Sequence, residues 1–302
     1  MVLERVRATG LVREGEPLVV LLSGGRDSVC LLDCAVALGA RVTALHVDYG
    51  LRAGAAADER HCAALCERLG VELVVERPER PAGGNLQAWA RDVRYAAAAR
   101  LAATIATGHT ATDQAETILY RLAASPGRRA LLGMAPREGA IVRPLLGVTR
   151  AETAAHCERR GLTWREDPTN DSPLFARNRI RSGLVRELEG VHPAAVENVV
   201  RTAALLRDEA EVLDEVVATA LAGRDSIPVA TLAALPRALA RLVVRRLAED
   251  AAGGLCPRAA NRLDDVLALE SGALDLGDGA RAVVERGVLR MAPTPPLPAR
   301  SR

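Results

Sequence analysis

The sequence contains no lysine, so all 40 of its basic residues are arginine. This absence excludes a Walker A lysine, the lysine of a protein-kinase site and any covalent intermediate on a lysine amine. If the chain uses ATP, it must therefore bind the polyphosphate in another way. With 302 residues, 49% of them hydrophobic, the chain is long enough for a buried core, and two domains are expected rather than one.

Cysteine pairs and long apolar runs are also missing. The six cysteines include no CxxC pair, which argues against a disulfide framework and predicts free, buried thiols. Cys62 and Cys66 could form half of a metal site, but no second half lies near them in the sequence. The first apolar run, Leu18 to Leu22, is far shorter than the roughly 20 residues of a membrane span. Charged residues precede it and no signal peptide is present, so we expect a cytoplasmic protein with no membrane segment.

The net charge is only +2, but its distribution along the chain is uneven. Residues 121–186 include thirteen arginines and six acidic residues, whereas the chain after residue 200 has fourteen of each. The middle third is therefore the better candidate for a surface that faces phosphate. The alternative is that these arginines lie on solvated helix faces, as arginine clusters often do.

Short apolar runs alternate with longer stretches of helical spacing in the first part of the chain. The runs are Leu18 to Leu22, Val42 to Val47, Val71 to Val75 and Ile105 to Thr107. This alternation predicts an α/β fold with a doubly wound parallel sheet, and the apolar strands indicate helices on both faces. In such a sheet, functional groups gather where the strands end.

The pattern changes at about residue 191, which predicts two domains, 1–190 and 191–302. The second is expected to be smaller and mainly helical, because long stretches rich in alanine, leucine, valine and arginine follow one another. Glycine-containing turns at residues 277–279 and 286–287 predict two short β-hairpins. The proline-rich tail after Pro293 is expected to be disordered.

A Gly- and Ser-rich turn follows the first predicted strand and leads into a helix. Glycines allow close backbone approach to an anion, and helix amides and serine hydroxyls can donate to phosphate oxygens. The predicted phosphate-binding residues are Ser23, Gly24, Gly25, Arg26, Asp27 and Ser28. The alternative is a tight turn in which Ser23 or Asp27 caps the helix. A carboxylate beside phosphates would repel them, so we predict a Mg²⁺ ion bridging Asp27 and the pyrophosphate.

With this turn, the sequence resembles the PP-loop ATP pyrophosphatase superfamily, whose signature is SGG-x-DS. Its members split ATP between the α and β phosphates, which suits a chain without a Walker A lysine. They include lysidine synthetases, tRNA thiolases, and GMP, NAD and asparagine synthetases. The resemblance implies a fold similar to that of the adenine nucleotide α hydrolases.

Two further segments resemble the lysidine synthetases. Leu45 to Arg52 is similar to their HVDHGLR run, which implies that His46 and Asp48 face the adenosine, while Tyr49 replaces the usual second histidine. Ala106 to Thr117 resembles ATGH-x-x-DDQ-x-E-T, although Thr112 replaces the first aspartate. The catalytic candidates here are His109, Asp113 and Glu116. The spacing of the two acids places them on one helix face, but an aspartate near a helix start can also be only a favourable charge.

Four later segments complete the resemblance. A glycine loop containing Gly127, the Gly133-Met134 pair and Val142 to Leu146 match the family's loop, G-M and I-R-P-L-L patterns, and are expected to cover the nucleotide. Trp164 to Arg181 contains the family's D-P-[ST]-N and R-N-x-[IL]-R runs. Arg177 and Arg181 lie four residues apart and would reach a phosphate from one helix face. A salt-bridged structural helix is the alternative.

The resemblance covers about residues 15 to 190 and implies an enzyme that modifies tRNA. ATP would adenylate carbon 2 of the wobble cytidine in tRNA(Ile) with a CAU anticodon, and L-lysine would then displace AMP. Asp113 or Glu116 would bind the lysine ammonium or accept its proton. Larger family members carry an extra carboxyl-terminal domain for tRNA, for which this chain is too short. A PP-loop thiolase, an amidating synthetase, a nucleotide-binding module without turnover, and a homodimer all stay open.

Overall fold

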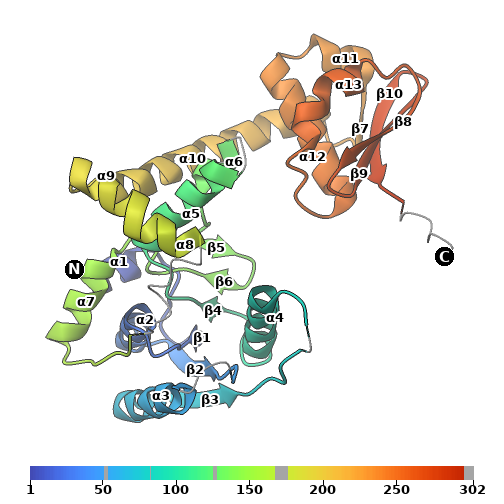
Figure 1. Ribbon diagram of the computed structural model, residues 1–302. Helices are drawn as coiled ribbons and strands as arrows, with labels where there is room; N and C mark the ends of the chain where they lie inside the picture. Colours follow the sequence, from blue (N-terminus) through green and yellow to red (C-terminus); the bar gives the residue numbers. More distant parts are fainter. Residues whose placement is uncertain (51–53, 82, 125–127, 167–175, 296–302) are drawn as a thin grey trace. The chain divides into compact units, whose positions relative to one another are not determined.

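The computed structural model describes residues 1–50, 54–81, 83–124, 128–166 and 176–295. The chain forms two compact units, Met1–Leu206 and Arg207–Arg302, each of which is described by itself (Figure 1). Among the described residues, no helix is both long and apolar enough to cross a membrane. All six cysteines are free and buried, which confirms the prediction from their spacing.

The first unit is built on a six-stranded sheet. The strands are β1 (Pro17–Leu21), β2 (Arg41–Val47), β3 (Glu72–Glu76), β4 (Ile105–Ala106), β5 (Arg137–Glu138) and β6 (Ile141–Val142). Their order is β3-β2-β1-β4-β6-β5, and all neighbours are parallel except the pair β5 and β6. The order reverses between β1 and β4, and ligands bind at such a switch point in doubly wound sheets. The predicted α/β fold is confirmed, although β5 and β6 were not predicted.

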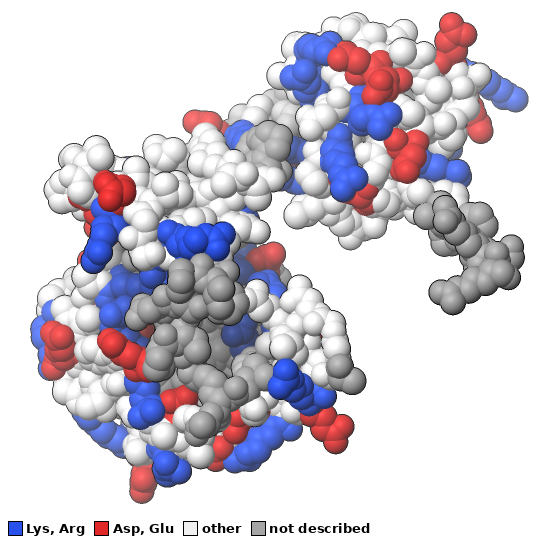
Figure 2. All heavy atoms as spheres, viewed as in Figure 1, with Lys and Arg blue, Asp and Glu red and all other residues white. Residues whose placement is uncertain are grey.

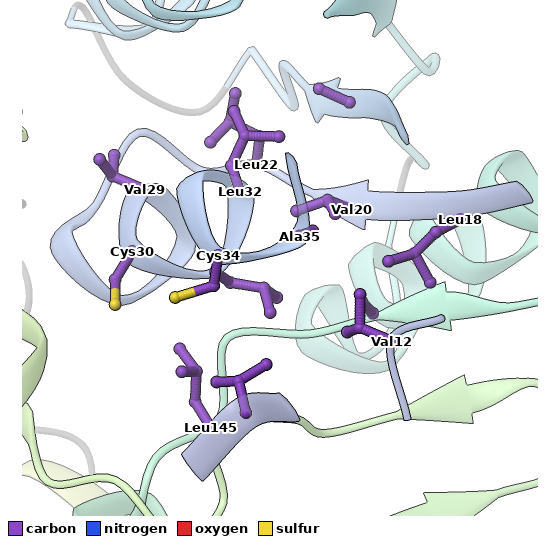
Figure 3. Close-up of a cluster of buried hydrophobic side chains, with 14 of the residues drawn as sticks. Val12, Leu18, Val20, Leu22, Val29, Cys30, Leu32, Cys34, Ala35 and Leu145 are labelled. Carbon is purple, nitrogen blue, oxygen red and sulfur yellow. The ribbon is translucent and has the colours of Figure 1, made fainter. Parts of the chain in front are cut away.

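Strand β1 shows why the sheet is apolar on both faces. Leu18 and Val20 contribute to a core with α1 (Val2–Ala8), α2 (Arg26–Ala37), α3 (Ala55–Leu69) and α7 (Arg150–Arg159), part of which is drawn in Figure 3. Val19 and Leu21 point to the opposite face, where they pack with α4 (Leu86–Ala99). Successive side chains of a strand alternate between faces, so both sets must be apolar.

A helical segment follows the sheet and packs on α5 (Ala111–Ala124). It comprises α8 (Ala176–Arg179), a π-helix (Ile180–Val185), α9 (Arg186–Val191) and the beginning of α10 (Ala195–Leu221). Ile180, Val185 and Val196 form a small core with Ala111 and Ala115 of α5. A short helix, α6 (Arg128–Leu132), also contacts α5. This packing brings Arg181 of the π-helix beside Glu116 of α5.

The second unit combines helices with a four-stranded antiparallel sheet in the order β7-β10-β9-β8. Its elements are β7 (Ser226–Pro228), α11 (Val229–Ala234), α12 (Arg237–Ala252), a 3₁₀-helix (Ala259–Arg262), α13 (Leu263–Leu267), β8 (Gly272–Gly277), β9 (Ala280–Glu285) and β10 (Val288–Pro293). The antiparallel pairs β8–β9 and β9–β10 are the hairpins expected from the glycine-containing turns. Strand β7 was not predicted. From residue 296 on, the tail lies outside the described residues.

Candidate active site

A cavity of about 800 Å³ lies where strands β1, β2 and β4 end, at the switch point of the sheet. Residues of the turn after β1, of Thr107–His109 after β4 and of the first turns of α5 and α7 form its wall. Trp164, Arg165 and Glu166 close another side. Eight of the predicted site residues lie on this wall, namely Ser23, Gly25, Arg26, Asp27, Ser28, His109, Asp113 and Arg181.

The turn after β1 is held in shape by its own hydroxyl groups. The Ser28 hydroxyl donates to the Gly25 carbonyl oxygen at 2.7 Å, and the Ser23 hydroxyl lies 3.1 Å from it. Gly24 adopts a φ of 80°, which favours glycine. Helix α2 begins after Gly25 with no side-chain cap. The alternative in which Ser23 or Asp27 caps the helix is therefore not observed, and the first-turn amides are placed to bind an anion.

Gly108 lets the end of β4 lie directly against this turn. A Cβ atom at position 108 would lie 3.1 Å from the backbone carbon of Asp27 and 3.1 Å from the amide nitrogen of Ser28. Backbone atoms cannot move aside as a flexible side chain can, so only glycine allows this approach. On either side of it, the Thr107 hydroxyl and His109 Nδ1 are 2.7 Å apart. The approach brings His109 and the turn to the same cavity.

Arg150 lies among three carboxylates from two other helices. Its Nη2 donates to Asp113 Oδ1 at 2.8 Å, while its Nε is 3.5 Å from Asp27 Oδ2 and its Nη1 is 3.6 Å from Glu116 Oε1. The Arg150 side chain is 22% exposed. Thr153, one turn further along α7, donates to Asp27 Oδ1 at 2.6 Å. Helix α7 thus contributes the cation that neutralises acids of α2 and α5.

Local sequence fixes the start of α7 and hence the position of Arg150. Thr149 and Glu152 form a capping box, in which the Thr149 hydroxyl accepts from the Glu152 amide and the Glu152 carboxylate accepts from the Thr149 amide at 2.8 Å. Although burial opposes the shift, the hydrogen bonds from Thr149 and the Arg5 guanidinium lower the pKa of Glu152. Arg150, the first residue of the helix, is therefore held by a charged cap.

Residues 3–188 match the family described as a PP-loop domain. The chain is 39% identical to the tRNA(Ile)-lysidine synthase of Thermobifida fusca, covering 85% of this chain and 83% of that protein. The chain belongs to the tRNA(Ile)-lysidine synthase family. It is also 41% identical to the synthase of Pseudomonas fluorescens over 65% of this chain, but it spans about half the length of that relative, namely 47%.

A solved structure shows the same fold. The U34-tRNA thiolase NcsA of Methanococcus maripaludis matches with a TM-score of 0.57 and 18% sequence identity, covering 68% of this chain and 78% of the thiolase. At this identity the likeness concerns the fold alone. It agrees with the PP-loop match and with the switch-point position of the cavity.

The two acids that the family resemblance singled out on α5 have different surroundings. Asp113 lies on the cavity wall, and its Oδ2 accepts from the amide and the hydroxyl of Thr110, both at 2.8 Å. It therefore also closes the first turn of its helix. Glu116 is fully buried, and its Oε1 accepts from Arg181 Nε at 2.6 Å. Both acids approach Arg150, but only Asp113 also faces the cavity.

Of the two arginines predicted to reach a phosphate from one helix face, only one has a described side chain. Arg181 lies on the cavity wall and pairs with Glu116, as the alternative of a salt-bridged helix would have it. Arg177 belongs to α8, but its side chain lies outside the described residues. The D-P-[ST]-N run and Gly127 lie outside them as well. The segment before that run is fixed, because the Arg165 amide donates to the Gly24 carbonyl oxygen at 2.9 Å.

His46 and Asp48 do not line the cavity, so the described geometry gives no support to their prediction as nucleotide-binding residues. Leu45 and Val47 of β2 line it instead, and strand alternation turns His46 toward α3. There its Nδ1 lies 2.9 Å from the Leu22 carbonyl oxygen. The Asp48 carboxylate accepts from the Gly50 amide at 2.9 Å, which closes a local turn.

The G-M and I-R-P-L-L segments expected to cover the nucleotide also lie away from the cavity wall. The Gln114 side chain binds the backbone of Met134 through two hydrogen bonds of 2.7 and 2.8 Å. Arg143 is 3% exposed and donates to the Ala135 carbonyl oxygen at 2.7 Å. In this structure the motif residues hold neighbouring backbone segments of the same chain in place.

Sequence reasoning missed an aromatic part of the wall. Tyr49, Tyr95 and Trp164 line the cavity, and they are three of only six aromatic residues in the chain. Burial raises the pKa of Tyr49, whose hydroxyl donates to the Ala90 carbonyl oxygen at 3.0 Å. Arg94 of α4 lies beside them, with its Cζ 5.3 Å from the centre of the Tyr95 ring. The scarcity of aromatics elsewhere was the signal that could have found them.

Proposed function

We propose that this chain joins L-lysine to carbon 2 of the wobble cytidine of tRNA(Ile) with a CAU anticodon. In the first step, the cytidine carbonyl oxygen attacks the α phosphate of ATP, and pyrophosphate leaves. In the second, the ε-amine of lysine attacks carbon 2, AMP leaves with the oxygen, and the amine loses a proton. The observation that carries this proposal is the single cavity in which the turn after β1, Asp113 and Arg150 meet in a lysidine synthase family member.

The triphosphate of ATP would lie against the turn and the first amides of α2. Among the described residues, the cavity wall carries more positive than negative side chains, with Arg26, Arg94, Arg150, Arg165 and Arg181 against Asp27, Asp113 and Glu166. Donors fixed before the reaction stabilise charge as it develops on the leaving group. This balance supports binding of a polyphosphate without any lysine.

The residues present also fit a Mg²⁺ ion. Asp27 and Asp113 come from different helices, yet their carboxylates approach the same guanidinium, that of Arg150. Oxygen ligands of this kind suit Mg²⁺, and a cation is needed where two carboxylates face phosphate. Asp27 would hold the ion, which would supply positive charge to the departing pyrophosphate.

Asp113 is the better candidate to receive the lysine ammonium. An amine attacks only when it has lost its proton, so a carboxylate must bind the ammonium or accept that proton. Glu116 is fully buried and already paired with Arg181. Asp113 is also paired, with Arg150, but it lies on the cavity wall, where a bound lysine can reach it. We therefore assign the contact with lysine to Asp113 and a positioning role to Glu116.

The aromatic part of the wall would receive the bases. An enzyme that modifies a base must take it out of its stack, and aromatic faces replace the lost stacking. Tyr49, Tyr95 and Trp164 provide such faces on the cavity wall. The adenine of ATP and the wobble cytidine are the two bases of the proposed reaction.

The test is an omission experiment with purified protein, ATP, labelled L-lysine and transcribed tRNA(Ile) bearing CAU. We expect stable labelling of the tRNA only when all three are present, and a nucleoside mass increase that corresponds to lysine. The control is the same tRNA with U in place of the wobble cytidine, which should stay unlabelled. Sulfur addition would favour the thiolase alternative instead. Absence of both pyrophosphate release and labelling would overturn the proposed activity.

A further inference from the structure

A thiol and imidazole cluster lies between α2 and α7, away from the cavity wall. Cys30 and Cys34 are one turn apart on α2, and their sulfur atoms lie on the same side of the helix (Figure 3). His156 of α7 faces them, with its Nε2 3.8 Å from Cys34 Sγ. The ligand atoms of these three residues all lie within 4.8 Å of one another. Together with Asp33, they are called the α2–α7 cluster below.

The spacing of the cluster suits a tetrahedral metal ion. Zinc bonds to sulfur and nitrogen of about 2.0–2.3 Å place the ligand atoms roughly 3.3–3.8 Å apart. The separation of Cys34 Sγ and His156 Nε2 already has this value. Cys30 and Cys34 are fully buried and His156 is 7% exposed, so water would be excluded. Thiolate and imidazole ligands favour zinc over magnesium or calcium.

Asp33 is the carboxylate beside the three ligand residues and completes the charge balance of the cluster, although it is not among the residues whose ligand atoms lie within 4.8 Å of one another. Its Oδ2 is 2.8 Å from His156 Nε2, and its Oδ1 accepts from Arg160 Nη2 at 3.0 Å. With zinc bound, the two thiolates and the Asp33 carboxylate carry three negative charges, which the ion and the Arg160 guanidinium neutralise. Without zinc, two neutral thiols leave Asp33 and Arg160 as a balanced pair. The Arg160 side chain is 55% exposed, so the positive end of this pair lies at the surface.

A second cysteine pair shows that helical spacing alone does not make such a site. Cys62 and Cys66 lie at the same spacing on α3 and are also buried. Cys62 Sγ lies 3.5 Å from His46 Nδ1, but these residues do not form a group of three ligand atoms within 4.8 Å of one another. Within the described part of the chain, three such ligand atoms gather only at the α2–α7 cluster. The α3 pair is therefore a matched control.

We propose that Cys30, Cys34 and His156 bind one zinc ion. Asp33 would become the fourth ligand by moving its carboxylate from His156 toward the ion. Binding replaces the two thiol protons with zinc–sulfur bonds and releases both protons to solvent. The Nε2 proton of His156, which now faces the Asp33 carboxylate, moves to Nδ1, and the Nε2 lone pair binds the metal. Because both thiols must lose their protons to bind zinc, binding should strengthen as pH rises.

The site would fix the helices that build the cavity. Helix α2 starts at the phosphate-binding turn, and α7 carries Arg150 and Thr153, which contact Asp27. A metal between these helices would hold the arginine against the acids. This role is structural and does not depend on which base or amine the enzyme uses.

The test uses the untagged full chain, because a histidine tag would itself bind metal. The protein is loaded with Zn²⁺, passed through a chelating resin and analysed for metal, and Co²⁺ loading is followed by absorbance. We expect about one zinc per chain, release of about two protons per ion, and a thiolate-to-cobalt charge-transfer band with strong tetrahedral visible bands. The double variant Cys30→Ser/Cys34→Ser should lose all three signals. The matched variant Cys62→Ser/Cys66→Ser should keep them.

Several results would overturn the site. If the wild-type protein binds cobalt without a charge-transfer band, the ion has no thiolate ligands. This measurement needs no variant, so it does not depend on whether a variant folds. Equal metal content in both double variants would place the ion elsewhere. A disulfide between Cys30 and Cys157 in the isolated protein, found by mass spectrometry without reduction, would show that these thiols serve redox chemistry instead.

Discussion

The two units of the chain differ in what they bury. Among the described residues, every buried polar or charged side chain lies in the first unit, including Asp33, Asp113 and Glu116. The core of the second unit contains only apolar residues and one cysteine, Cys256. Figure 2 shows charges of both signs spread over the visible face of that unit. One unit thus buries charge, and the other keeps it at the surface.

Buried charges of the first unit, such as Asp113, lie beside its cavity, whereas the second unit depends on apolar packing. Taking a charged group out of water costs several kcal/mol unless partners compensate for it. The first unit meets this cost with arginines on α7 and the π-helix, which hold acids of α2 and α5 beside a cavity. The second unit gains stability from packing of helices on its sheet. Substitutions in the two units should therefore produce different kinds of damage.

The largest effect is expected from Asp27→Asn. The substitution keeps an oxygen that can accept the Thr153 hydroxyl but removes the charge, so the fold should persist. We expect pyrophosphate release with ATP and tRNA to fall on the order of 10³-fold, because the carboxylate that would hold the cation is lost. Circular dichroism should be unchanged.

The matched control for this prediction is Asp264→Asn in the second unit. Asp264 is exposed and pairs with Arg237 at the surface. It should leave pyrophosphate release unchanged. Near-normal release by Asp27→Asn would remove the acid from the reaction, and an equal loss in both variants would contradict the contrast between the units.

An intermediate effect is expected from Leu232→Ala in the apolar core. Leu232 is fully buried in the second unit, and removal of its methyl groups leaves a cavity. We expect the free energy of unfolding of this unit to fall by about 3 kcal/mol, measured by calorimetry. Leu255→Ala, at a site 73% exposed, should change it by less than about 0.5 kcal/mol. Similar values for the two variants would show that this core is loosely packed.

The smallest effect is expected from Glu152→Gln in the capping box of α7. The pKa of Glu152 is lowered in the folded chain, so its contribution is present above the unfolded value of 4.5 and is lost as pH falls through the folded value. The variant should be less stable than wild type by about 0.5 kcal/mol at pH 7, and the difference should shrink below pH 4.5. Urea unfolding at both pH values measures it.

Glu158→Gln, an exposed acid near the other end of α7, is the control for that series. It makes no capping box, so its stability difference from wild type should not follow the same pH course. A pH-independent difference for Glu152→Gln would show that the charge of the cap is not what stabilises the helix.

The parallel sheet and the turn after β1 could be predicted because both depend on neighbours in sequence. Apolar runs identify strands, and a Gly- and Ser-rich turn before a helix identifies a phosphate-binding loop. The orientation of His46 could not be predicted, because both faces of its strand are covered and the pattern does not show which one meets the cavity. Arg150 was missed because its partner Asp113 is 37 residues away. His156 is 122 residues from Cys34, and only folding brings them together.

The two oxygens of Asp113 have different partners. Oδ2 accepts from the amide of Thr110 at the start of α5, and Oδ1 accepts from Arg150. An alanine at this position would destabilise the start of the helix and would also remove a negative charge from the cavity wall. If only alanine variants were tested, a loss of activity caused by disruption of the helix would therefore be mistaken for the loss of a catalytic group. Asparagine keeps an oxygen for the Thr110 amide while deleting the charge, and so it isolates the electrostatic share of the loss.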